Sequence, residues 1–250
     1  MKHCFIAILL MFSIINLSAQ EIDNNSSDSG SSIASTSNEE SHPIKETLSS
    51  FTAIDVDASI ELTLVKLKSN EAPYVVYDTK GAYTSKFSAV VDDKSKTLKI
   101  SERNDPKRES ITEVKVYFSE LTDIHISKAR TKVEGTLTSQ IIDVYISDDA
   151  TFTADIDVLD IKLVVSGKSR VVLTGNTHYQ SANIYTAEYD GSALSTISTN
   201  VEVSHNAVAK VNAVERLEAK TATGAQVLYY TQPVILRSEV ALFGGEIIRM

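Results

Sequence analysis

Cysteine is almost absent from this chain: among its 250 residues the only one is Cys4, close to the start. Tryptophan does not occur at all. Because Cys4 lies in a leader that we expect to be removed, the remaining chain has no thiol. That absence excludes disulfide bonds and cysteine-ligated metal or redox centres.

Long apolar runs are also missing, apart from one at the start of the chain. The first twenty residues read MKHCFIAILLMFSIINLSAQ, with Lys2 before an apolar run over residues 5–15 and small residues up to Ala19. This pattern predicts a signal peptide, residues 1–19, and a mature chain that starts at Gln20. The run is too short for a membrane-spanning helix, which needs about 20 apolar residues. Cys4 precedes the run, whereas a bacterial lipoprotein carries its cysteine just after it, so we expect no lipid anchor.

Positive charge is scarce as well. Lys and Arg number 24 against 33 Asp and Glu, which gives a formal net charge of -9. An acidic surface is a poor partner for nucleic acid or for an anionic membrane, so we expect neither. No later stretch approaches transmembrane length, and we expect no transmembrane segment. The predicted destination is the periplasm, the outer-membrane surface or the outside of the cell, reached by the general secretory route.

Large apolar residues are sparse between the leader and the first patterned segment. Residues 21–43 read EIDNNSSDSGSSIASTSNEESHP, a composition that buries too little surface to offset the cost of ordering. We therefore expect a disordered tether over residues 20–46. The remaining residues, 47–250, are enough for one sizeable domain.

Helical periodicity is missing from residues 47–250, and a period of two takes its place. The segment FTAIDVDASIELTLV, residues 51–65, alternates apolar and polar residues in the manner of half-buried strands. YVVYD, FSAVV, LKIS and VKVYFS follow, and VVDDKSKTLKI has the polar centre of a hairpin turn. These segments predict a strand-rich part over residues 47–120.

From residue 121 to residue 250 the strands become repetitive. Each repeat has a strand, a small or polar corner and a second strand, and the period is about 19 residues. Such a repeat predicts coils of a parallel β-solenoid stacked about 4.8 Å apart, with Val, Ile, Leu and Ala inward. An antiparallel β-sandwich also has short strands at regular spacing and stays open as an alternative. The residues taken to mark equivalent corners are Ala129, Ala150, Ser169, Ser192, Ala207, Ala225 and Gly244.

Several segments together resemble a family of bacterial secreted proteins, the auto-transporter adhesins with a head GIN domain. The segments are FTAIDVDASIELTLV, VVDDKSKTLKIS, VKVYFSELTDIHISKARTKVEG and the corners SDDAT, SGKSR and TGAQ. The resemblance covers most of the chain after the tether and implies a right-handed parallel β-helix and a role in adhesion. The family's corners are typically richer in glycine, and those at residues 148–151 and 205–209 have none, which marks a divergent member. The resemblance transfers no catalytic or binding residue.

The stretch IKLVVSGKSRVVLTG, residues 161–175, raises the question of a phosphate-binding loop at Gly167, Lys168 and Ser169. Such a loop needs a glycine five residues before Gly167 and a helix that starts at the lysine. The first position is Lys162, and the sequence after Ser169 has the pattern of a strand. We therefore interpret SGKS as one corner of the repeat.

Motifs for other chemistry are absent too. Acidic pairs such as Asp148 and Asp149 lack calcium-loop spacing, and His125, His178 and His205 lack metal-ligand spacing. No GxSxG nucleophile elbow occurs among the serines. We predict no catalytic residue, no metal site and no cofactor.

Tyrosines are the remaining candidates for a binding surface, because aromatic faces stack on sugars and are frequent in protein interfaces. Tyr229 and Tyr230 are adjacent on an expected strand, so one of them must point outward. The residues proposed for a surface patch are Tyr185, Tyr189, Tyr229 and Tyr230.

These observations favour a non-enzymatic secreted or cell-surface protein of the adhesin type, which binds a macromolecule or matrix through the outer faces of a solenoid. The expected partner is an unidentified macromolecule, for example a glycan or a surface protein. A polysaccharide-active lyase or hydrolase on the same scaffold is an alternative, since fold does not decide function. Self-assembly is a third, because the uncapped end of a solenoid exposes strand backbone and favours a homo-oligomer.

Overall fold

The computed structural model describes residues 43–68, 71–80, 86–103, 110–241 and 243–250. Within these ranges the chain forms strands and no α-helix. The predicted signal peptide, residues 1–19, and residues 20–42 of the predicted tether lie outside the described residues. The first strand starts at Ile44, which falls within the last three residues of the segment expected to be a tether.

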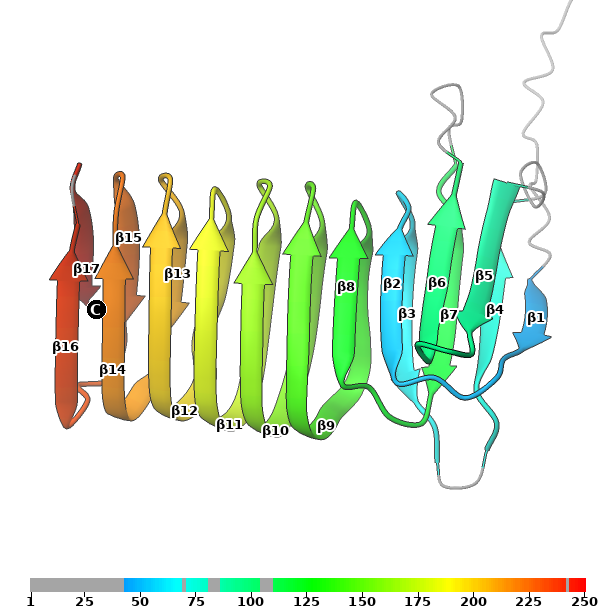
Figure 1. The fold of residues 1–250 in the computed structure, drawn as a ribbon, viewed down its shortest axis with the longest axis horizontal. Helices are drawn as coiled ribbons and strands as arrows, with labels where there is room; N and C mark the ends of the chain where they lie inside the picture. Colours follow the sequence, from blue (N-terminus) through cyan, green and yellow to red (C-terminus); the bar gives the residue numbers. More distant parts are fainter. Residues whose placement is uncertain (1–42, 69–70, 81–85, 104–109, 242) are drawn as a thin grey trace, which may run out of the picture. The chain divides into compact units, whose positions relative to one another are not determined.

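The strands fall into two groups along the chain (Figure 1). Those before the repeats are β1 (Ile44–Thr47), β2 (Ala53–Asp57), β3 (Glu61–Lys66), β4 (Tyr74–Asp78), β5 (Phe87–Asp92), β6 (Thr97–Glu102) and β7 (Glu113–Phe118). Those of the repeats are β8 (Asp123–Ser127), β9 (Arg130–Ser147), β10 (Thr151–Val165), β11 (Arg170–Tyr185), β12 (Glu188–Ser204), β13 (Val208–Val211), β14 (Ala213–Thr221), β15 (Ala225–Tyr229), β16 (Ile235–Val240) and β17 (Gly245–Arg249).

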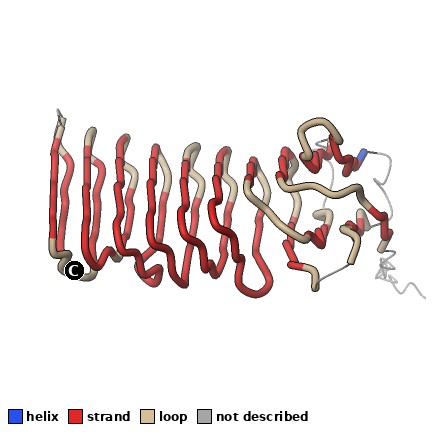
Figure 2. The backbone as a smooth tube through the Cα atoms, turned by 60° about the horizontal axis from the view of Figure 1, so that its bottom comes forward, coloured by secondary structure: helices blue, strands red, loops and turns tan. Residues whose placement is uncertain are grey.

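The repeats form a parallel β-solenoid of about seven turns, as predicted from the sequence. Every strand pair from β8 to β17 is parallel, so the antiparallel sandwich is wrong for this part of the chain. Each coil runs along one side, turns a tight corner and returns along the other side, and Figure 2 shows these flat, two-sided coils stacked in a row. The long strands β9 to β12 belong to both sides.

The coils thus build two facing sheets. Sheet I contains β6, β2, β8, the C-terminal halves of β9 to β12, β14 and β16. Sheet II contains β7, β3, the N-terminal halves of β9 to β12, β13, β15 and β17. The core lies between the sheets, where alternate side chains of each strand point inward.

Straight columns of apolar side chains fill the core. In one column of sheet I the parallel registers align residues from successive coils, and each of them is at most 1% exposed. The members of this column are Val144, Leu163, Ala182, Val201 and Ala219. Burial of such columns, at about 25 cal/mol per Å² of apolar surface, provides the main stabilisation of the stack.

The corners place one small residue of each coil in a second inward column, whose members are buried except for the half-buried Ala187 and Gly245. Its members are Ala129, Ala150, Ser169, Ala187, Ala207, Ala225 and Gly245. Two of the residues predicted to mark equivalent corners, Ser192 and Gly244, do not belong to this column, so those two predictions are wrong. Ser192 lies inside β12, where a register shift opposite Val172 to Thr174 inserts an extra residue, and the corner of that coil is at Ala187.

The two ends of the described stack differ. At the β6–β7 end, antiparallel strands continue both sheets: β5 pairs with β6, β4 with β7, and β1 with β4. At the other end, β16 pairs only with β14 and β17 only with β15 among the described residues. Of these strands, β4 and β5 belong to the predicted strand-rich part, residues 47–120, whereas β1 lies mostly in the last residues of the predicted tether.

Candidate functional site

The outer face of sheet II carries rows of side chains that run along the stack. Successive strands align their outward residues because parallel pairing keeps the register from coil to coil. One row that crosses eight strands consists of Lys115, Thr63, Lys132, Thr153, Val172, Asp190, Lys210 and Leu228. Lysine and threonine alternate in the row from β7 to β10, and Val172, the ion pair of Asp190 with Lys210, and Leu228 follow toward β15.

A shallow groove of about 370 Å³ crosses β7, β3, β9 and β10 on this face. Thr63 forms its floor and is 8% exposed, while Lys115 and Lys132 stand exposed on either side. The two lysines are two strands apart, so their Cα atoms are separated by about 10 Å. Other lining residues include Glu61, Glu113, Arg130, Thr151 and Thr153.

The two acidic groups of the groove are already paired. Arg130 Nη1 lies 3.5 Å from Glu61 Oε1, and Lys80 Nζ lies 2.9 Å from Glu113 Oε1. The hydrogen bond to Glu113 holds the pKa of Lys80 above its ordinary value. Neither Lys115 nor Lys132 forms an ion pair with a residue that the structure describes. The groove is therefore locally positive on a chain whose formal net charge is negative.

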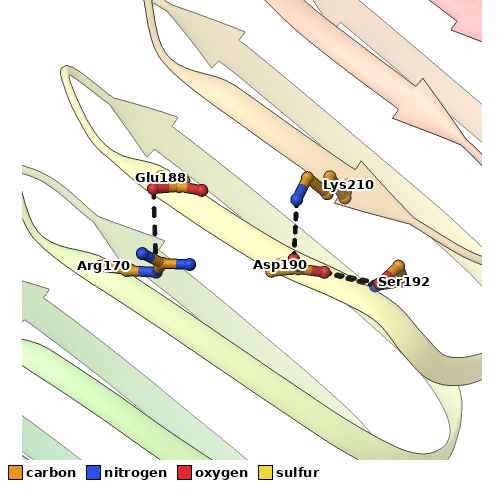
Figure 3. Close-up of polar contacts among 5 residues, drawn as sticks. All are labelled: Arg170, Glu188, Asp190, Ser192 and Lys210. Atoms are coloured by element: carbon orange, nitrogen blue, oxygen red, sulfur yellow. Dashed lines mark hydrogen bonds and ion pairs between the residues drawn. The ribbon is translucent and has the colours of Figure 1, made fainter.

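Further along the same face, β11, β12 and β13 carry a second polar cluster (Figure 3). Asp190 lies at its centre: its carboxylate accepts hydrogen bonds from Lys210 Nζ at 2.9 Å and from Ser192 Oγ at 2.6 Å. Burial tends to raise the pKa of Asp190, but these hydrogen bonds outweigh it and the pKa lies below its ordinary value. Arg170 and Glu188, at 3.8 Å, form a more exposed pair beside it.

This cluster is structural in the first place. Ser192 also donates its backbone N–H to Asp190 at 3.2 Å, which fixes the extra residue of the β12 bulge. Asp190 and Lys210 join two successive coils. Each charged group of the cluster is paired with a group of opposite charge, so we assign the cluster to the stability of the stack.

Sheet I carries a separate group on its outer face. Tyr145 lies between Lys162 and Asp143, with its hydroxyl 2.9 Å from Lys162 Nζ and 3.4 Å from Asp143 Oδ2. The ring of His125 stacks on the Tyr145 ring with centroids 4.4 Å apart. The hydrogen bond with Tyr145 holds the pKa of Lys162 above its ordinary value, so this amine stays protonated at neutral pH.

The four tyrosines proposed from the sequence do not form one patch. Tyr185 and Tyr230 are exposed, by 38% and 40%, but Tyr185 ends β11 on sheet I and Tyr230 follows β15 on sheet II. Tyr189 is fully buried and Tyr229 is 8% exposed, so the prediction that they lie at the surface is wrong.

The reason lies in the core around Tyr189. Its ring passes over the backbone of Gly191, where a Cβ would lie 2.2 Å from the tyrosine hydroxyl, and that hydroxyl accepts a hydrogen bond from Gln180 Nε2 at 2.5 Å. Thr199 Oγ1 donates to Gln180 Oε1 at 3.3 Å and is 2.6 Å from Thr196 Oγ1. This buried polar network satisfies the hydroxyl and lets a tyrosine replace an aliphatic core residue.

The SGKS stretch is a corner, as predicted. Gly167 and Lys168 both have positive φ, 65° and 62°, and Lys168 N donates to Thr186 O at 2.7 Å. Ser169 is a buried member of the corner column, and a strand follows it. Without a helix after the lysine, the backbone N–H groups do not converge on a phosphate position.

The sequence analysis did not identify the two lysines of the groove as candidate binding residues. Each stands at an outward position of an alternating strand, and that much is visible in VKVYF and RTKVE. Their alignment is not visible, because β3 pairs between β7 and β9 although it precedes both in the chain.

Acidic, histidine and cysteine side chains form no group of three or more that could hold a metal ion in the part of the chain that the structure describes. No helix of the described residues is long and apolar enough to cross a membrane.

Fold and surface together define a class: a two-sided parallel β-solenoid with polar outer faces. The family model "Putative auto-transporter adhesin, head GIN domain" matches residues 50–233. The chain therefore belongs to this family, as its sequence segments suggested. No curated protein matches the sequence.

Solved structures of low sequence identity share the fold. A putative adhesin from Bacteroides fragilis superposes with a TM-score of 0.77 at 13% identity, covering 84% of this chain and 97% of that one. A putative adhesin from Parabacteroides distasonis gives a TM-score of 0.66 at 15% identity, covering 85% and 98%. A protein described as a putative lipid binding protein, also from Parabacteroides distasonis, gives 0.64 at 13% identity, covering 84% and 98%. At these identities the likeness shows the fold alone.

Proposed function

We propose that this protein is a non-enzymatic, adhesin-like protein of the cell surface or extracellular space. It binds a macromolecule through the outer face of sheet II, at the groove over β7, β3, β9 and β10. Membership of the adhesin family supports this location and this kind of role. The observation that carries the proposal is the groove itself, in which two exposed lysines flank a hydroxyl floor.

The chemistry of the groove favours an acidic polysaccharide as the partner. Lys115 and Lys132 each offer three N–H donors to carboxylate or sulfate groups, and their spacing suits a polymer that lies across the strands. Thr63 and Thr153 add hydroxyl groups, which both donate to and accept from sugar hydroxyls. The open, shallow shape admits a chain that extends beyond the groove at both ends.

An array of acidic and neutral polysaccharides, probed with the full chain, tests this function. The double variant Lys115→Gln and Lys132→Gln should weaken binding to acidic polymers about tenfold or more, because both charge-assisted contacts are lost. The control is Lys94→Gln with Lys168→Gln, which removes the same charge at exposed turns outside the groove. Binding should also fall with salt, since exposed charges are screened.

Three outcomes would contradict this proposal. The first is that the protein binds no polysaccharide on the array. The second is an equal loss of binding in both double variants, and the third is selective binding to acidic proteins. The last would keep the groove but replace the partner.

A polysaccharide lyase is the second candidate, and the group at Tyr145 favours it. A tyrosine hydroxyl beside Lys162, Asp143 and His125 brings acids and bases together on the outer face of sheet I. The raised pKa of Lys162 argues against it as a general base at neutral pH. Release of unsaturated products from the same polysaccharides, abolished in Tyr145→Phe, would establish this enzyme and displace the adhesin proposal.

A further inference from the structure

In the last coil that the structure describes, inward positions that the preceding coil buries are exposed. β16 is exposed along its whole length, and β17 is at most half-buried. Within the described residues, neither strand has a partner on its outer side. Each therefore presents unpaired N–H and C=O groups, which is the usual template for pairing with another strand.

Side chains at this end continue the core columns. Leu236 and Val240 align with Leu217 and Thr221 of the preceding coil, which are at most 1% exposed. Leu236 and Val240 themselves are 37% and 53% exposed. A contiguous apolar end beside a free strand edge is a surface built for association.

We propose that a second copy of this chain covers this end. In the complex, β16 of one copy pairs antiparallel with β16 of the other, about a twofold axis at Ser238. This pairing places Leu236 of each copy opposite Val240 of the other on the inward side. It places Arg237 opposite Glu239 on the outward side.

The charges of β16 select this register and this partner. A shift of the axis by one residue, to Arg237 or to Glu239, would set two arginines or two glutamates directly opposite each other. Only the axis at Ser238 pairs opposite charges and keeps the inward and outward sides in phase. The strand is thus complementary to itself, as a twofold interface requires.

The pairing would also extend a charge ladder that the structure already contains. Glu218 Oε1 lies 3.1 Å from Arg237 Nη1, and Lys220 Nζ lies 3.2 Å from Glu239 Oε2. Across the interface, Arg237 would meet Glu239 of the second copy, and that residue is itself paired with Lys220. The row then alternates in sign over four strands.

The same axis brings β17 of each copy side by side, so both sheets would continue across the interface. A twofold contact is closed: it uses the same end of both copies and leaves the ends with β4 and β5 outward. Dimers are therefore expected, and not fibres.

Sedimentation equilibrium of the full chain over the micromolar range tests the interface. Val240→Lys should make the protein monomeric, because a lysine that is solvated in the monomer would be buried at the interface. Ile141→Lys, on β9 and 60% exposed, is the matched control and should leave the dimer intact. A monomer at all concentrations, or a dimer that survives Val240→Lys, would overturn the proposal.

Two charge variants test the register even if Val240→Lys disturbs the last coil. Arg237→Glu and Glu239→Arg should each weaken self-association about tenfold or more, since each homodimer then contains two like-charge pairs. An equimolar mixture should form heterodimers, in which both pairs are again opposite in sign. The repulsion that each variant introduces with Glu218 or Lys220 is the same in monomer and dimer. A mixture that associates no better than its components would refute this register.

Discussion

Single residues at the SGKS corner differ sharply in what they do. Val171 is fully buried in the core, Val172 is half-buried on the outer face, and Lys168 is exposed. Alternation along the strand thus decides which substitution matters.

Three variants at this corner should separate the two sides of the strand. Val171→Asp buries a charge without a partner and should lower the free energy of unfolding by about 3 kcal/mol or more. Val172→Asp should have a much smaller effect, and Lys168→Ala should change it by no more than about 0.5 kcal/mol. Thermal melts with and without ATP provide the measurement. Stabilisation by ATP that disappears in Lys168→Ala would mean that the corner holds a phosphate after all.

The direction of a tyrosine side chain could not be predicted from the sequence. Alternation alone would make Tyr189 inward or outward with equal ease, and nothing in EYDGSA reveals that β12 contains a bulge at Gly191. The hydrogen bond from Gln180 comes from the preceding coil, nine residues earlier in the chain. A contact of this kind depends on the register between coils, which a single strand does not encode.

At the scale of the element, glycine is required inside β11, whereas the corners at residues 148–149 and 205–206 reach positive φ without it. Gly175 has φ of 101°, and a Cβ there would lie 2.1 Å from Ile156 O of the neighbouring strand β10. Gly135, in β9, also has positive φ, at 80°, but a Cβ there would meet nothing within 4 Å. An alanine at Gly135 would therefore add backbone strain alone, whereas an alanine at Gly175 would add both strain and steric overlap.

Replacing each glycine by alanine should give unequal damage. Gly135→Ala carries only the strain of a left-handed alanine, about 1 kcal/mol. Gly175→Ala adds a clash with backbone that cannot move without breaking the β10–β11 ladder, so we expect a loss of about 3 kcal/mol or more. Urea denaturation of both variants measures the difference. Equal losses would show that β10 and β11 separate at this point without penalty.

Strand type and parallel stacking were predictable because they follow from local pattern. Apolar alternation set the inward faces, and the period of about 19 residues implied coils. The corner of the fourth repeat was not predictable in the same way. Asp190, Gly191 and Ser192 read as a turn by composition, yet they form a bulge within β12, while Thr186 and Ala187 make the corner. The same turn-forming residues occur in corners and in bulges, and only the register with the neighbouring coil distinguishes a corner from a bulge.

For the whole molecule, stability should vary along the stack. Each coil contacts only its neighbours, so a coil in the middle is held on both sides and the last coil on one side. The end at β6 and β7 is covered by antiparallel strands, whereas β16 and β17 have no such cover among the described residues. Opening should therefore begin at β16 and β17.

Hydrogen exchange of the backbone amides measures this gradient directly. At concentrations low enough for a monomer, the amides of β16 and β17 should exchange about 100-fold faster than those of β10 and β11, because opening one end coil exposes far less than opening the middle. Raising the protein concentration should slow exchange in β16 and β17 alone, since only these strands gain a partner in the proposed dimer. Uniform exchange at every concentration would instead mean that the stack opens as one unit, with no separate end coil for a second copy to protect.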